Sequence, residues 1–222
     1  MRPTPLPPSD PSFARARETL VASLRTDVRD DRVLDAFEKV PRERFVSADL
    51  AYRAYEDRPL PIGHGQTTSQ PRMIALMLQE LGLKGTERVL ELGTGSGYET
   101  ALLSELAAEV VSVELIPSLA EGAARVLQEL GYGNFTLHVA GDELGWPPSA
   151  PYDAMVVAAG SPRVPPSLID QLAQGGRMVI PVGSREEQDL LMIERRPEGT
   201  TIYRRGGCRF VPLIGAEAFA SD

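Results

Sequence analysis

The sequence contains a single cysteine, Cys208, among 222 residues. One cysteine excludes an intramolecular disulfide, and a cysteine-based zinc site would lack its partner thiolates, so we expect no metal. This cysteine content is typical of a reducing compartment. The sequence also lacks any apolar run near the roughly 18 residues that a transmembrane helix needs, and residues 1–13 lack the apolar core of a secretory signal. We therefore expect a cytoplasmic protein that has no membrane partner.

Basic residues are also scarce, because 23 lysines and arginines face 31 acidic residues and leave a net charge of −8. Proteins that bind a phosphate backbone are usually basic, so we expect no nucleic-acid partner. Hydrophobic residues make up 42% of the chain and charged residues 24%, which excludes global disorder and a fibrous repeat. We take a monomer as the expected oligomeric state.

The chain divides into a proline-rich tail and one domain. Residues 1–12 contain five of the 19 prolines and little that can pack, which predicts a disordered, extended tail. At about 150 residues per domain, the remaining residues 13–222 are expected to fold as a single unit. Within it, residues 13–70 are predicted to hold helices and a long loop, residues 71–182 a central core, and residues 183–222 C-terminal strands.

Short apolar runs alternate with helical patterns from residue 85 onward. The predicted strands are 88–92, 110–113, 135–139, 154–159 and 177–182, and helices are predicted between them over 98–106, 119–130 and 167–172. Near-continuous apolar strands separated by helices are typical of a parallel sheet covered on both faces. Three further strands, predicted at 190–195, 200–203 and 209–213, have no helices between them, which indicates an antiparallel edge.

The N-terminal region shows helical spacing over residues 33–40 and 73–81, with Pro41 ending the first helix and Pro71 beginning the second. Residues 46–70 lack a clear period, and a loop this long in a compact domain is usually functional. The predicted fold is therefore a Rossmann-like α/β fold. It has a mostly parallel twisted sheet with helices on both faces, antiparallel C-terminal edge strands and an N-terminal helical extension.

A glycine-rich turn joins the first predicted strand of the core to a helix. Gly93, Gly95 and Gly97 allow backbone to approach a ligand closely, at the strand end where open α/β sheets bind ligands. A dinucleotide fingerprint would place a small residue at position 98, but Tyr98 stands there. The carboxylate of Glu91 would repel a phosphate and attract an ammonium group. These features favour S-adenosylmethionine (SAM) over a nicotinamide dinucleotide.

Two more acidic residues follow the next strands. Glu114 ends the second strand, where an acid can accept hydrogen bonds from ribose hydroxyls. Asp142 follows the third strand and can accept from an adenine amino group. Each acid taken alone is better explained as an exposed loop residue, but the set together with the three glycines favours a nucleoside site. The predicted cofactor-binding residues are Glu91, Gly93, Thr94, Gly95, Gly97, Glu114, Leu115, Asp142 and Glu143.

Several longer motifs carry a family resemblance between about residues 33 and 215. They are residues 40–45 (VPRERF), 54–57 (AYED), 59–63 (PLPIG), 65–71 (GQTTSQP), 90–98 (LELGTGSGY), 150–153 (APYD), 175–176 (GG) and 210–213 (FVPL). In order and spacing, the sequence resembles the protein-L-isoaspartate O-methyltransferases. The glycine turn is shared by many SAM enzymes, whereas the GQTTSQP and FVPL strings are more specific.

The resemblance implies a SAM-dependent methyltransferase that modifies the free α-carboxylate of L-isoaspartyl residues in damaged proteins and peptides. It implies that Ser69 is the catalytic residue and that isoaspartyl proteins are the partners. The alternative for Ser69 is a cap on the helix that begins at Pro71. The implied substrate-binding residues are His64, Gln66, Thr67 and Thr68.

The sequence departs from the usual family pattern at Thr68, Glu143 and Ala158. Of these, Glu143 affects the expected adenine contact, because it places a side chain where backbone approach is usual. Two other functions stay open: a methyltransferase of the same fold that acts on another carboxylate or small molecule, and a non-catalytic SAM-binding module.

Overall fold

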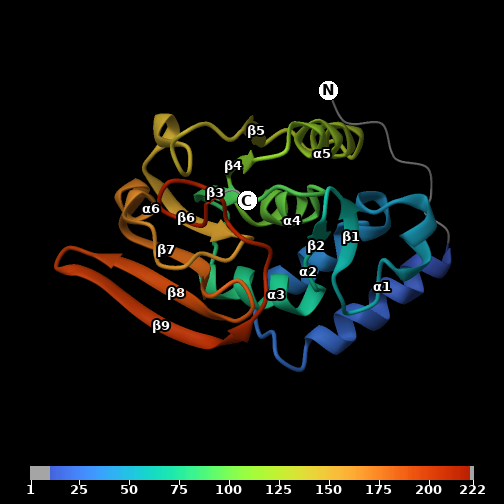
Figure 1. The fold of residues 1–222 in the computed structure, drawn as a ribbon. Coiled ribbons are helices and arrows are strands. Elements are labelled where there is room, and N and C mark those ends of the chain that lie inside the picture. Colours follow the sequence, from blue (N-terminus) through green and yellow to red (C-terminus); the bar gives the residue numbers. More distant parts are fainter. Residues whose placement is uncertain (1–10, 221–222) are drawn as a thin grey trace.

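The computed structural model describes residues 11–220, which form a central sheet with helices packed against it (Figure 1). The predicted tail of residues 1–12 lies outside this range except for its last two residues. These belong to helix α1 (Pro11–Leu24), so the tail prediction is corrected there. Proline suits the first turn of a helix because its missing N–H would have no intrahelical acceptor there.

The main sheet has seven strands in the order β5-β4-β3-β6-β7-β8-β9. The first five strands in this order are mutually parallel, and β8 and β9 extend the sheet as antiparallel edge strands. This confirms the predicted parallel core and antiparallel C-terminal edge. The strands are β3 (Arg88–Leu92), β4 (Glu109–Glu114), β5 (Phe135–Val139), β6 (Tyr152–Val157), β7 (Leu172–Gly183), β8 (Gln188–Arg196) and β9 (Gly199–Cys208).

Helices cover the sheet unequally. Alternate strand residues such as Val89 and Val110 pack on one face with α1 to α4, and their neighbours Leu90 and Val111 pack on the other face with α6. The helices are α2 (Asp31–Lys39), α3 (Pro71–Leu81), α4 (Tyr98–Leu106), α5 (Pro117–Glu129) and α6 (Pro166–Gln171), with 3-10 turns η1 (Arg42–Phe45), η2 (Ala48–Arg53) and η3 (Pro147–Ser149).

Two segments differ from the sequence-based prediction. Residues 46–70 contain a hairpin, β1 (Leu60–Gly63) and β2 (Gln66–Thr68), whose tip is Gly63-His64-Gly65, all with positive φ. Residues 209–213 are not a strand but an extended segment attached to residue 160 by two backbone hydrogen bonds of 2.8 and 2.7 Å. The pairing is a single isolated bridge between residues 160 and 212, so it does not extend into a strand.

Aromatic packing joins the N-terminal helices to the core. The rings of Phe37 on α2 and Phe45 on η1 lie 6.0 and 5.7 Å from the ring of Tyr98, centroid to centroid. Phe37 and Tyr98 are each 1% exposed. Tyr98 is the first residue of α4, so this aromatic cluster ties the N-terminal extension to the helix that follows the glycine turn.

Removing the Phe37 ring is expected to destabilise the whole fold. Phe37→Ala leaves a cavity in a fully buried cluster, which costs about 3–5 kcal/mol. The measurement is the free energy of unfolding from denaturant titration. Ile202→Ala, at a position that is 52% exposed on β9, is the control. An equally small loss of unfolding free energy in both variants would mean that the N-terminal helices are not part of the cooperative core.

Candidate functional site

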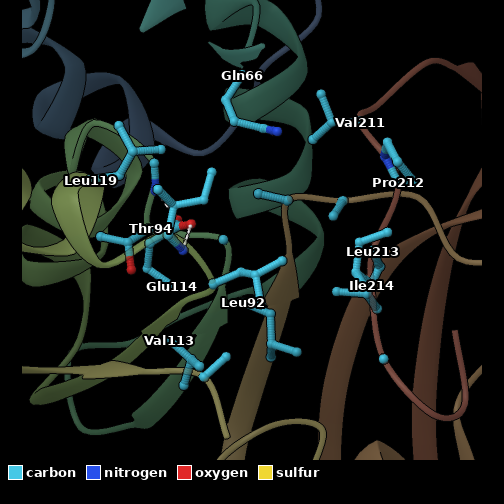
Figure 2. A pocket seen from close by; sticks show the side chains of 18 of the residues that line it. Gln66, Leu92, Thr94, Val113, Glu114, Leu119, Val211, Pro212, Leu213 and Ile214 are labelled. Carbon is cyan, nitrogen blue, oxygen red and sulfur yellow. Dashed lines mark hydrogen bonds between the residues drawn. The ribbon is translucent and has the colours of Figure 1, made fainter. Parts of the chain in front are cut away.

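A crevice of about 430 Å³ opens at the carboxyl ends of β3, β4 and β6. Figure 2 shows Leu92 and Val113 at its base, Thr94 and Glu114 on one wall, and the segment 211–214 on the opposite wall. A pocket of this size is typical of small-molecule sites. Most predicted site residues line it: Gln66, Thr67, Thr68, Ser69, Gly93, Thr94, Gly95, Glu114, Leu115, Asp142 and Glu143.

The glycine turn has a backbone conformation that residues with side chains rarely adopt. Gly93 and Gly95 have φ of +95° and +54°, which favours glycine at both positions. A Cβ on Gly93 would lie 3.4 Å from the Cβ of Ala158, and one on Gly95 would lie 3.2 Å from the Cδ1 of Ile62. The backbone of the turn can therefore come directly against a bound molecule.

Glu114 is held at the crevice by backbone donors. Its two carboxylate oxygens accept hydrogen bonds from the N–H groups of Gly95 at 2.8 Å and Ile116 at 2.9 Å. The side chain is only 6% exposed. Each oxygen keeps a second lone pair, so the fixed carboxylate can accept further hydrogen bonds from a pair of hydroxyls.

Glu91 does not line the crevice, and its predicted contact with the cofactor is corrected. Its carboxylate is fully buried and accepts hydrogen bonds of 2.6 Å from the hydroxyls of Thr100 and Ser112. Side chains alternate along a strand, so Glu91 points with Val89 toward the helices while Leu92 points into the crevice. Ser112 in turn bonds Thr94 at 2.5 Å, so Glu91 supports the glycine turn from beneath.

Two other predicted residues also lie outside the crevice wall. A Cβ on Gly97 would lie 3.0 Å from the Cβ of Ala123, so this glycine permits close packing of α4 against α5. His64 lies at the exposed tip of the β1–β2 hairpin, where its Nε2 is 3.0 Å from the hydroxyl of Ser118. Neither position supports the predicted direct contact.

Ser69 lines the crevice and does not cap α3. The N-cap position is occupied by Gln70, whose side-chain amide donates to Asp57 at 3.0 Å. Asp57 also accepts from the backbone N–H of Arg72 at 2.9 Å. Burial opposes ionisation of Asp57, but these hydrogen bonds outweigh it and hold its pKa below the ordinary value. The capping alternative for Ser69 is therefore replaced by the contacts of Asp57 at the start of α3, and Ser69 is among the residues that line the crevice.

A buried arginine braces the segment that carries these residues. Arg42 is 0% exposed, and its guanidinium donates to the backbone carbonyls of Ala54, Glu56, Arg58 and Ser69. The distances range from 2.6 Å at residue 54 to 3.3 Å at residue 58. Arg42 also lies over the Tyr98 ring, 5.5 Å from its centroid. One side chain thus fixes the path of residues 54–69 relative to α4.

Some of the residues that line the crevice were not predicted from the sequence pattern alone. The apolar wall formed by Val211, Pro212, Leu213 and Ile214 was marked only by the FVPL motif of the family resemblance. Glu99, the second residue of α4, carried no signal, because an acid in the first turn of a helix is common. Asp142 and Glu143 lie at the exposed rim, so the departure at Glu143 does not fill the crevice.

The family model for protein-L-isoaspartate(D-aspartate) O-methyltransferase matches residues 15–218. The chain belongs to this family. The Syntrophobacter fumaroxidans protein-L-isoaspartate O-methyltransferase 1 is 50% identical over 206 residues, which are 92% of this chain and 96% of that protein. An Anaeromyxobacter dehalogenans protein-L-isoaspartate O-methyltransferase is 57% identical over 189 residues, or 84% of this chain and 90% of its own.

Solved structures agree with this family. A protein-L-isoaspartate O-methyltransferase matches with a TM-score of 0.82 and 32% identity, covering 91% of this chain and 67% of its own. A candidate family member from Plasmodium falciparum, in complex with S-adenosyl-L-homocysteine, matches with a TM-score of 0.75 and 25% identity over 90% of this chain and 96% of its own. The cofactor of this family is SAM.

Within residues 11–220, no group of side chains has the composition and spacing to hold a metal ion. The helices of the same region are all too short or too polar to span a bilayer.

Replacing Arg42 by lysine is expected to loosen the acceptor side of the crevice. Lysine lacks the planar fork of donors that reaches four carbonyls, so some buried carbonyl oxygens lose their hydrogen-bond partners. Each such loss costs about 1–3 kcal/mol. We expect a lower unfolding free energy and a methyl-transfer rate that falls more than SAM affinity does. Denaturant titration measures the unfolding free energy, calorimetry measures the SAM affinity, and a turnover assay measures the methyl-transfer rate. Arg204→Lys, whose side chain is 80% exposed, is the control and should match the unmodified chain.

Proposed function

We propose that this crevice transfers a methyl group from SAM to the free α-carboxylate of L-isoaspartyl residues in damaged proteins and peptides, which begins their repair. The observation that carries the proposal is the crevice itself, where hydroxyl residues 67–69 line the same space as the glycine turn and Glu114. A nucleoside site and an acceptor site thus share one cavity.

The chain's residues fit the parts of the cofactor. The fixed carboxylate of Glu114 would accept hydrogen bonds from the two ribose hydroxyls, and the backbone of Gly93 and Gly95 would contact the amino-acid portion. Asp142 at the rim would accept a hydrogen bond from the adenine amino group. When bound, SAM supplies a methyl group on an electrophilic sulfonium.

The acceptor needs no general base. A carboxylate with a reference pKa near 4 is ionised at neutral pH, so the position of His64 away from the crevice wall is compatible with the chemistry. Ser69 donates its hydroxyl hydrogen to one carboxylate oxygen and leaves the other free to attack. The apolar segment 211–214 excludes water from the nucleophile. Orientation of this kind supplies up to about 7–11 kcal/mol of the barrier.

We further propose that the chain is a cytoplasmic monomer built as one domain over residues 13–222, and that it binds neither nucleic acid nor membranes. The net charge of −8 and the single half-buried cysteine support this proposal.

The substrate test uses two peptides of one sequence that differ only in an isoaspartyl or aspartyl linkage. With labelled SAM, we expect methyl incorporation into the isoaspartyl peptide alone. A free dicarboxylate serves as the small-molecule acceptor. Equal labelling of both peptides, or labelling of the dicarboxylate only, would replace the proposed substrate with another acceptor.

Ser69→Ala is expected to lower turnover on the isoaspartyl peptide by about 10- to 100-fold, because the acceptor carboxylate loses its positioning donor. SAM affinity measured by calorimetry should stay within about twofold. Ser47→Ala, at an exposed position before η2, is the matched control. Turnover near that of the control would remove Ser69 from the reaction.

Glu114→Gln is expected to weaken SAM binding by about tenfold or more, since an amide accepts fewer and weaker hydrogen bonds from the ribose hydroxyls. It also puts a donor opposite the N–H groups of Gly95 and Ile116. Glu121→Gln, exposed on α5, controls for the loss of one charge. Unchanged SAM affinity in Glu114→Gln would exclude the ribose contact.

A further inference from the structure

A second buried carboxyl group lies at the start of α4. Glu99 is 6% exposed and is among the residues that line the crevice, whereas Glu91 is not. Burial raises the pKa of Glu99 well above its ordinary value, and repulsion from Glu91 raises it further. Two neighbouring carboxyl groups in so dry a place do not both ionise. The pair therefore keeps a proton at neutral pH.

Hydrogen bonds decide which member of the pair carries that proton. Glu91 accepts from the hydroxyls of Thr100 and Ser112, and such donors favour the ionised form. Both hydrogen bonds reach the Oε2 of Glu91, and the Oε1 atoms of Glu91 and Glu99 are each buried without a hydrogen-bond partner within residues 11–220. The two hydroxyl donors therefore favour the ionised form of Glu91 and the protonated form of Glu99. A buried polar group without a partner is costly, and a ligand that supplies an acceptor recovers that cost.

The position of Glu99 indicates the chemistry of that ligand. It is the second residue of α4, immediately after the glycine turn, and it shares the crevice with Thr68 and Ser69 of the acceptor segment. The N-terminus of a helix carries a partial positive charge that favours anions. A protonated carboxyl group can donate a hydrogen bond, so its position beside such a helix end suits a ligand that carries a carboxylate.

We propose that Glu99 is a cofactor-binding residue whose protonated carboxyl donates a hydrogen bond to the α-carboxylate of SAM. This inference rests on the proposed function only in that SAM occupies the crevice. With the ribose at Glu114, the amino-acid end of SAM would lie along the glycine turn, and Glu99 is the second residue of the helix after that turn. The isoaspartyl carboxylate is the other carboxylate in the reaction, and the experiment separates the two.

The experiment compares Glu99→Gln, which keeps a donor of similar shape, with Glu99→Met, which keeps the shape and removes the donor. Calorimetry measures the affinity of each variant for SAM and for decarboxylated SAM, which lacks the α-carboxylate. We expect Glu99→Gln to bind SAM within about threefold of the unmodified chain and Glu99→Met to bind it about tenfold more weakly. Decarboxylated SAM should bind equally to all three.

Thermal unfolding without ligand checks that the variants are folded. Glu99→Met should melt at a higher temperature than the unmodified chain, since it removes an unpaired buried carboxyl group, whereas a purely structural role predicts a lower one. Four results would overturn the inference. They are unchanged SAM affinity in Glu99→Met, equal losses for SAM and decarboxylated SAM, an equal loss in Glu99→Gln, and a change confined to the KM of the isoaspartyl peptide. The first three are binding measurements, so they stand even if the chain methylates a different acceptor.

Discussion

The acceptor side of the crevice depends on the guanidinium of Arg42, which binds four backbone carbonyls between residues 54 and 69. The segment it holds contains little regular structure apart from a two-stranded hairpin, so few of its backbone groups find partners within the segment itself. A planar cation with a fixed fork of donors satisfies several such carbonyls at once. Because Arg42 also lies over the ring of Tyr98, the same contact sets the distance between the acceptor segment and the glycine turn.

The opposite side of the crevice is built on carboxylates that the backbone and hydroxyls hold in place. Glu114 accepts from two N–H groups at the mouth of the crevice, and Glu91 lies beneath the turn with Ser112 and Thr100. Glu114 is thereby oriented before any ligand arrives. An oriented acceptor loses little entropy on binding, which is the general advantage of a site formed in advance.

The sequence predicted the central core well because its signals are local. The strand Arg88–Leu92 and the helix Tyr98–Leu106 have the predicted bounds, since an apolar run, three glycines and a helical pattern follow one another directly. Residues 209–213 were wrongly predicted as a strand, because an apolar run does not reveal that the segment pairs through one isolated bridge to residue 160. Glu91 was placed on the wrong face of the sheet for a different reason. The two-residue period of a strand fixes which side chains share a face, but the sequence does not say which face meets the ligand. Apart from its place in the VPRERF motif, Arg42 carried no signal for its role, since its four acceptors lie 12 to 27 residues away.

The apolar wall at residues 211–214 comes after the last strand of the sheet and lies against residue 160 through backbone hydrogen bonds. The binding crevice is therefore closed by the final tenth of the chain, although the glycine turn is complete less than halfway along it. During synthesis, the nucleoside-binding turn leaves the ribosome long before the wall that covers it. Residue 211 follows Gly97 by 114 residues, so a nascent chain carries an open turn before it can enclose a ligand.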